Sequence, residues 1–125
     1  MKRIPTLAHR SILIVEDEPL VALGVHTVLS SAGASIISAS TTDEAKALIS
    51  FAEVSGAIVD VQLGDKDASE ICRLLDRRRI PFLFYTGNRS ASLLKEWPEV
   101  PVLSKPSSPQ ALVCAIAEML DGSVT

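Results

Sequence analysis

Five side chains that could take part in one reaction follow short apolar runs of the sequence: Glu16, Asp17, Asp60, Thr86 and Lys105. Unbroken runs rich in Ile, Val, Leu and Phe are typical of strands that are buried on both faces of a parallel sheet. The carboxyl ends of parallel strands share one edge, and open α/β folds bind their ligands there. We therefore expect three carboxylates, one hydroxyl and one ammonium group to converge at that edge.

Three carboxylates in one pocket repel each other, by about 3 kcal/mol for two charges ~5 Å apart at an effective dielectric constant near 20. A divalent cation relieves this repulsion. Oxygen ligands suit Mg²⁺, which leaves coordination positions for water and for phosphoryl oxygens. A carboxylate can then act as the nucleophile of a phosphoryl transfer, while the hydroxyl and the ammonium bind the other phosphoryl oxygens. The pattern predicts Mg²⁺-dependent phosphoryl transfer.

The composition is that of an ordinary globular domain and limits the partners. The chain has 125 residues, of which 47% are hydrophobic and 22% charged, and this length fits one domain. The net charge of −3 argues against a nucleic-acid partner, because no basic excess is available to neutralise phosphates. No apolar run approaches the ~18 residues that a membrane span needs, and residues 1–10 lack the apolar region of a signal peptide. We therefore expect no membrane partner and a cytoplasmic location.

Strands and helices are predicted to alternate along the whole chain. The predicted strands cover residues 11–15, 35–39, 56–60, 80–85 and 100–104. Helical patterns follow each strand: the first helix is bounded by Pro19 and Gly33, and the second opens with a capping box from Thr41 to Glu44. The fourth helix is short, over residues 90–97, and Gly122 ends the fifth. This alternation predicts an α/β fold with a doubly wound, five-stranded parallel sheet and five helices on its two faces.

The predicted domain occupies most of the chain. Residues 1–10 form a loosely held lead-in, residues 11–121 form the domain, and residues 122–125 form a short tail. Cys72 and Cys114 both lie in apolar helical patterns, so we expect both to be buried. Neither has the spacing of a metal site.

Four motifs in this order resemble those of a response-regulator receiver domain of two-component systems: ILIVEDEP, IVDVQLGD, FYTG and LSKP. Each motif alone is common, but together they cover nearly the whole chain and all lie at predicted strand ends. The resemblance implies the flavodoxin-like fold of the receiver CheY, with the strand order 2-1-3-4-5.

The resemblance also implies a role for each site residue. Asp60 would accept a phosphoryl group from a histidine kinase or a phosphotransfer protein. The implied Mg²⁺ ligands are Glu16, Asp17, Asp60 and the main-chain carbonyl of Gln62. The residues implied to bind the phosphoryl group and to switch are Thr86, Gly87 and Lys105.

Two positions depart from the common receiver pattern. Many receivers carry an aromatic switch residue where this chain has Val102, and a proline where it has Gly64. The stretch PFLFYTG instead resembles the PFxFATG segment of a receiver subgroup of alphaproteobacteria, whose members often stand alone and work with histidine kinases of the HWE or HisKA2 type. We expect signalling to order the loop after Gly87 and the short fourth helix, because Gly87 makes that loop mobile.

The expected function is that of a stand-alone receiver that signals through a partner or drains phosphate from a kinase. It would not be an enzyme beyond its own phosphorylation and dephosphorylation. Two copies are expected to pair weakly through the fourth and fifth helices.

Two other functions stay open at this point. A Mg²⁺-dependent phosphohydrolase of the haloacid-dehalogenase group would need a second Asp two residues after the nucleophile, where this chain has Gln62. A flavodoxin-like cofactor binder would need Ser, Thr and Gly donors after the first strand, where this chain has acidic residues.

Overall fold

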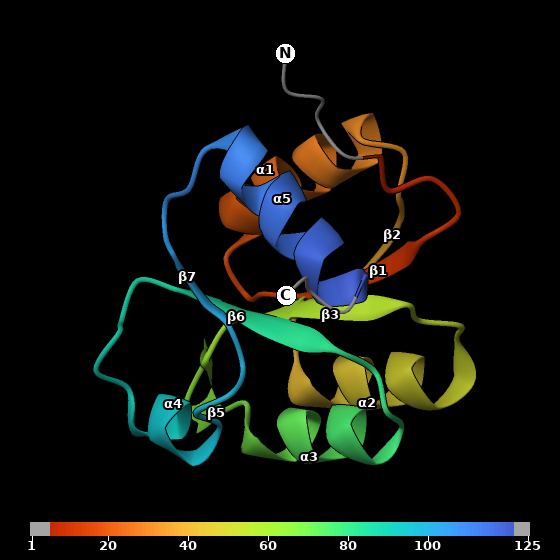
Figure 1. Cartoon of the computed structure of the whole chain (residues 1–125). Helices are drawn as coiled ribbons and strands as arrows, with labels where there is room; N and C mark the ends of the chain where they lie inside the picture. Colours follow the sequence, from red (N-terminus) through yellow and green to blue (C-terminus); the bar gives the residue numbers. More distant parts are fainter. Residues whose placement is uncertain (1–5, 122–125) are drawn as a thin grey trace.

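A five-stranded parallel sheet lies at the centre of the computed structural model, which describes residues 6–121. Its strands, in spatial order, are β2 (Ser35–Ala39), β1 (Ser11–Val15), β3 (Gly56–Val59), β6 (Phe82–Thr86) and β7 (Val102–Ser104) (Figure 1). Two very short strands, β4 and β5, lie between β3 and β6 along the chain. Without these two, the order is 2-1-3-4-5, so the predicted fold is confirmed.

Helices cover both faces of this sheet (Figure 1). One face carries α1 (Pro19–Ser31) and α5 (Pro109–Leu120), and the other carries α2 (Thr42–Phe51), α3 (Ser69–Arg77) and the short α4 (Ser92–Glu96). Successive side chains of a strand point to opposite faces. On β1, Ile12 and Ile14 accordingly pack in the core under α1 and α5, whereas Leu13 and Val15 pack in the core under α2 and α3. The strands are apolar without interruption because both of their faces are covered.

The predicted helix boundaries follow local chemistry. Pro19 stands at the first position of α1, and Gly33 adopts a φ of +105° just after the helix ends. At the start of α2, the Thr41 hydroxyl accepts a hydrogen bond from the Glu44 N–H at 3.1 Å. The Glu44 carboxylate accepts from the N–H of Ser40 instead of Thr41, so the reciprocal half of the capping box is displaced by one residue.

The segment after Asp60 has regular structure that the predicted elements do not include. It forms a small antiparallel hairpin of β4 (Gln62–Leu63) and β5 (Lys66–Asp67). Gly64 and Asp65 make the two-residue turn, and Gly64 has a φ of +63°, which suits the first position of a type II′ turn. Gly64 therefore belongs to a defined turn and not to a loosened loop.

Three strands and one helix have boundaries that differ by one or two residues from the predicted ones. β3 ends at Val59, and Asp60 lies just beyond it. β6 and β7 each begin two residues later than predicted, directly after Pro81 and Pro101, because proline has no N–H for a sheet ladder. The fourth helix is also shorter than predicted.

The described part of the lead-in is attached to the domain. Leu7 has only 1% of its surface exposed and packs in the core under α1 and α5. Its N–H donates to the Ala32 carbonyl at 2.8 Å, and Arg10 forms an ion pair with Asp121 at 2.9 Å. Residues 6–10 are therefore not loosely held, contrary to expectation. Residues 1–5, the predicted tail and the helix stop at Gly122 lie outside the described residues.

The two cysteines differ in their environment. Cys72 is buried in the core under α2 and α3, as predicted, but Cys114 on α5 is exposed, so that prediction was wrong. Within residues 6–121, no helix is long and apolar enough to cross a membrane.

Candidate functional site

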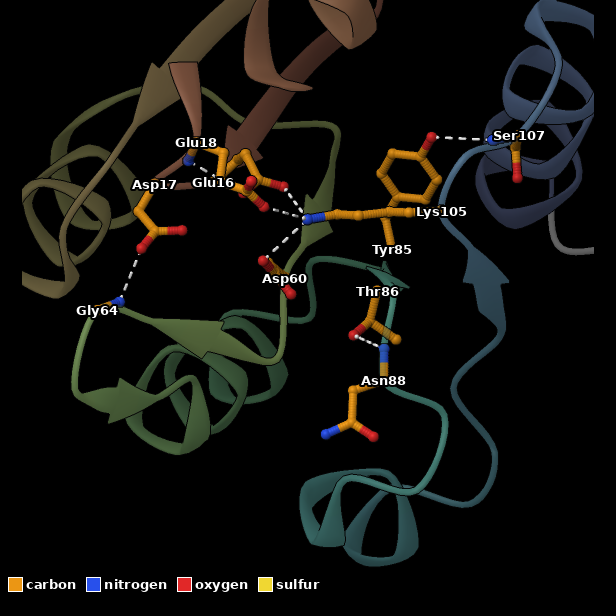
Figure 2. A network of polar contacts seen from close by, with 10 residues as sticks. All are labelled: Glu16, Asp17, Glu18, Asp60, Gly64, Tyr85, Thr86, Asn88, Lys105 and Ser107. Atoms are coloured by element: carbon orange, nitrogen blue, oxygen red, sulfur yellow. Dashed lines mark hydrogen bonds and ion pairs between the residues drawn. The ribbon is translucent and has the colours of Figure 1, made fainter. Parts of the chain in front are cut away.

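The five side chains singled out in the sequence come together at the carboxyl edge of the sheet (Figure 2). Each is placed there by the end of one strand. Glu16 and Asp17 follow β1, Asp60 follows β3, Thr86 is the last residue of β6, and Lys105 follows β7. Because these strands run parallel, their ends bring together residues that are far apart in the sequence.

The ammonium group of Lys105 forms the centre of this cluster. Its Nζ lies 2.7 Å from Glu16 Oε1, 3.0 Å from Asp60 Oδ2 and 3.5 Å from Glu18 Oε1. The Lys105, Glu16 and Asp60 side chains are buried to at least 86%, so water screens these ion pairs little. One cation thus offsets the charge of two buried carboxylates, and Glu18 adds a third, exposed one.

Three carboxylates are arranged so that they could hold a metal ion. Glu16, Asp17 and Asp60 each place one oxygen within 4.8 Å of the others. This all-oxygen donor set fits the ligand chemistry of Mg²⁺. Asp17 is oriented by the hairpin, because its Oδ2 accepts a hydrogen bond from the Gly64 N–H at 2.8 Å. Gln62 lies on β4 and donates from its side-chain amide to the Gly64 carbonyl at 3.0 Å. That its main-chain carbonyl is a ligand stays a prediction.

Burial and hydrogen bonds shift the pKa of two groups at the site. Burial raises the pKa of Glu16, and hydrogen bonds from Lys105 and from the Glu18 N–H offset this only in part. Burial alone would lower the pKa of Lys105, but its hydrogen bonds to Glu16 and Asp60 outweigh burial and raise its pKa to about 12. Lys105 is therefore a cation at any physiological pH, and a further cation would favour the ionised form of Glu16.

Thr86 is held at the site by its own turn. Its side chain is buried, with 1% of its surface exposed, and Oγ1 accepts a hydrogen bond from the Asn88 N–H at 3.0 Å. The hydroxyl hydrogen stays available as a donor. The Thr86 carbonyl accepts from the Lys105 N–H at 3.0 Å, which ties the ends of β6 and β7 together. Gly87 is exposed, and a Cβ added there would meet no atom within 4 Å.

Two residues near the site were missed by the sequence reasoning. Glu18 is not among the predicted site residues, yet its N–H donates to Glu16 Oε2 at 3.1 Å. Tyr85 is predicted only as part of a strand, yet its ring centroid lies 5.9 Å from Lys105 Nζ, and its hydroxyl accepts from the Ser107 N–H at 3.1 Å. The hydroxyl of Tyr85 is the feature of the sequence that could have indicated such a contact, because a buried tyrosine hydroxyl usually finds a hydrogen-bond partner.

Comparison with known proteins places this site in context. The family model described as "Response regulator receiver domain" matches residues 12–117. The chain is 32% identical over 114 residues to the phyllosphere-induced regulator PhyR of Methylorubrum extorquens, covering 87% of this chain and 43% of that protein. It is 30% identical over 118 residues to the transcriptional regulatory protein GltR of Pseudomonas aeruginosa, covering 89% of this chain and 49% of that protein. The chain thus spans a little under half the length of these relatives.

Solved structures have the same fold. The response regulator PhyR from Brucella abortus superimposes with a TM-score of 0.82 at 29% identity, over 94% of this chain and 50% of that one. A response regulator from Chloroflexus aurantiacus, described as putative, superimposes with a TM-score of 0.80 at 28% identity, over 90% and 98% of the two chains. The receiver domain of PhyR from Erythrobacter litoralis, at 23% identity and a TM-score of 0.82, supports the fold alone.

Proposed function

The chain belongs to the response regulator receiver domain family, and from this premise we propose that Asp60 accepts a phosphoryl group from a histidine kinase or a phosphotransfer protein. One observation carries the proposal. Asp60 lies between the Lys105 ammonium, 3.0 Å away, and the carboxylates of Glu16 and Asp17. A nucleophilic carboxylate, a fixed cation and a metal-binding acid pair are the parts that phosphoryl transfer to an aspartate needs.

In the proposed reaction an Asp60 carboxylate oxygen attacks the phosphorus of a phosphohistidine. The new O–P bond forms an acyl phosphate, while the P–N bond breaks and its electron pair returns to the imidazole. Mg²⁺, held by Glu16, Asp17 and Asp60, would offset the negative charge that gathers on the phosphoryl oxygens. Lys105 would pair with one phosphoryl oxygen, and the hydroxyl of Thr86 would donate to another. The main-chain carbonyl of Gln62 and the flexible Gly87 complete the proposed site.

We further propose that the donor is a kinase of the HWE or HisKA2 type. The likeness of the PFLFYTG segment to the subgroup motif supports this assignment. The phosphorylated domain would either signal to a partner protein or drain phosphate from the kinase. We place the protein in the cytoplasm and expect two copies to pair weakly through α4 and α5. Tyr85 stands where the subgroup motif has alanine.

The residue at position 62 does not support the alternative function of a phosphohydrolase. That mechanism needs an acid or base two residues after the nucleophile. The Gln62 side chain is an amide and is used within the hairpin, where it donates to Gly64. An amide does not exchange a proton with substrate at neutral pH, which supports a domain that accepts a phosphoryl group without turnover on other substrates.

Phosphorylation by radiolabelled acetyl phosphate or by a phosphorylated HWE or HisKA2 kinase tests the proposal. The wild-type domain should take up one phosphoryl group in a Mg²⁺-dependent reaction, and hydroxylamine should remove it because the product is an acyl phosphate. Asp60→Asn should take up none. Asp65→Asn is the matched control, because Asp65 lies nearby in the exposed hairpin turn and should be labelled normally. Labelling of Asp60→Asn at the wild-type level, or sustained hydrolysis of a phosphomonoester, would contradict the proposal.

A further inference from the structure

Tyr85 points to the opposite face of the sheet from Thr86, although the two residues are adjacent in the sequence (Figure 2). Neighbouring residues of a strand point to opposite faces. Thr86 therefore points toward Asp60, whereas Tyr85 is buried, with 6% of its surface exposed, in the core under α1 and α5 (Figure 2). Any displacement of the last residues of β6 moves both side chains together.

The ring and the hydroxyl of Tyr85 contact two points of the segment that joins β7 to α5. The Nζ of Lys105 lies 5.9 Å from the ring centroid, within the range of a cation–π contact. The hydroxyl accepts from the Ser107 N–H at 3.1 Å. The Tyr85 side chain thus contacts both Lys105 and Ser107, and Ser107 directly precedes the N-cap residue of α5.

Lys105 depends on such support because its side chain is long and flexible. Its main chain is held by the hydrogen bond from its N–H to the Thr86 carbonyl at 3.0 Å. Many receivers carry an aromatic residue on the last strand of the sheet at the position of Val102 on β7, but valine has no ring that could support Lys105. Within residues 6–121, Tyr85 is the aromatic residue that touches the Lys105 ammonium.

We propose that Tyr85 is a positioning residue for Lys105 and connects the phosphoryl site to the start of α5. Its hydroxyl fixes the loop at Ser107, and its ring lies beside the Lys105 ammonium, so that the ammonium is kept near Asp60. The inference rests on the proposed function of Asp60. It adds to that function by placing the aromatic residue that connects the phosphoryl site to α5 on β6, and not on β7, where many receivers carry one.

Tyr85→Phe tests the proposal because it keeps the ring and removes only the hydroxyl. Mg²⁺ affinity and then beryllofluoride affinity in saturating Mg²⁺ are measured by NMR titration of the whole chain. The Mg²⁺ dissociation constant should stay within about twofold of wild type, because Tyr85 contacts none of the three acids. The beryllofluoride dissociation constant should rise on the order of fivefold, the effect of one hydrogen bond.

Ser107→Ala is the matched control. It removes the hydroxyl contact with Ser104 but keeps the N–H that Tyr85 accepts, so both affinities should match wild type. Tyr85 is the single tyrosine of the chain, so a ¹³C-tyrosine label gives one ring signal in the wild-type protein. That signal should shift when beryllofluoride binds.

Several results would overturn the inference. These are an unchanged beryllofluoride affinity in Tyr85→Phe, an equal loss of Mg²⁺ affinity, an equal effect of Ser107→Ala, or a tyrosine signal that does not move. Failure of the wild-type protein to bind beryllofluoride at all would instead refute the proposed function of Asp60, and the inference with it. The two failures are therefore distinguishable in one series of titrations.

Discussion

Replacing Asp17 by asparagine should make the metal-free protein more stable and remove its response to Mg²⁺. The change removes one negative charge from the acid cluster. It keeps a side-chain oxygen that can accept the hydrogen bond from the Gly64 N–H, now 2.8 Å from Asp17 Oδ2. The hairpin contact is thus preserved, and the difference between the two proteins is electrostatic.

The size of the effect follows from the geometry. The Asp17 oxygen lies within 4.8 Å of oxygens of Glu16 and Asp60. Two unit charges at ~4.8 Å repel by about 3.5 kcal/mol at an effective dielectric constant of 20. Solvent around the exposed Asp17 and the neighbouring Lys105 ammonium reduce this to a net gain of about 1 kcal/mol for the variant. For a chain of this length, the melting temperature should rise by about 4 °C.

Mg²⁺ should stabilise the wild-type protein but hardly affect the stability of Asp17→Asn. At a concentration ten times the dissociation constant, a ligand that binds only the folded state stabilises it by about 1.4 kcal/mol, or about 5 °C in melting temperature. The wild-type protein should show this gain, and Asp17→Asn should show almost none in the same Mg²⁺ solution.

Urea and thermal unfolding with Mg²⁺ or with EDTA measure both effects. Glu18→Gln is the control, because Glu18 contacts Lys105 at 3.5 Å but is not one of the three clustered acids. Its Mg²⁺ response should equal that of wild type. A full Mg²⁺ response in Asp17→Asn, or a metal-free variant that is less stable than wild type, would refute the assignment of this acid cluster as the metal site.

Three further predictions concern the core and the ion pairs. Lys105→Met should lower the free energy of unfolding of the metal-free protein by about 3–5 kcal/mol in urea melts, because the buried Asp60 carboxylate loses its cation; a loss under about 1 kcal/mol would mean that water screens the pair. Burial raises the pKa of the Cys72 thiol to about 12, so a thiol reagent at pH 8 should label only Cys114 until the protein unfolds. A raised pKa stabilises the folded state fully below the ordinary value of 9.0, so stability should fall by about 1.4 kcal/mol per pH unit above pH 9, and Cys72→Ala should flatten this slope. Leu7→Ala should lower the free energy of unfolding by about 2–5 kcal/mol in chemical denaturation, because Leu7 is buried in the core under α1 and α5, and an unmeasurable loss would contradict this placement.

The parts of the fold that repeat a simple pattern could be predicted from the sequence. The apolar runs before Glu16 and Asp60 identified buried parallel strands, and parallel strands oblige their carboxyl ends to meet. The convergence of acids, hydroxyl and ammonium was therefore accessible without a structure. The exact ends of β6 and β7 were less accessible, because Pro81 and Pro101 lie in apolar runs that look continuous in sequence.

Contacts that depend on side-chain direction across several elements could not be predicted. Nothing local in the sequence indicates that Leu7 reaches the core or that Tyr85 reaches Ser107, since both depend on how α1 and α5 sit on the sheet. Cys114 lies in an apolar helix whose buried face is set by its packing, so its exposure was also missed. The Gly64–Asp65 turn did carry a readable signal, since Gly-Asp between short strands is a hairpin turn.

The shared position of Lys105 between Glu16 and Asp60 has a consequence for the order of events at the site. The ammonium is an internal counterion, so the domain without metal rests with its acids already partly neutralised. Binding of a dication by the three acids would replace one counterion by another and would let Lys105 leave Glu16. Readiness to accept a phosphoryl group would then depend on ambient Mg²⁺ before any donor is met, and added salt would change this little because the ion pairs of Lys105 are buried.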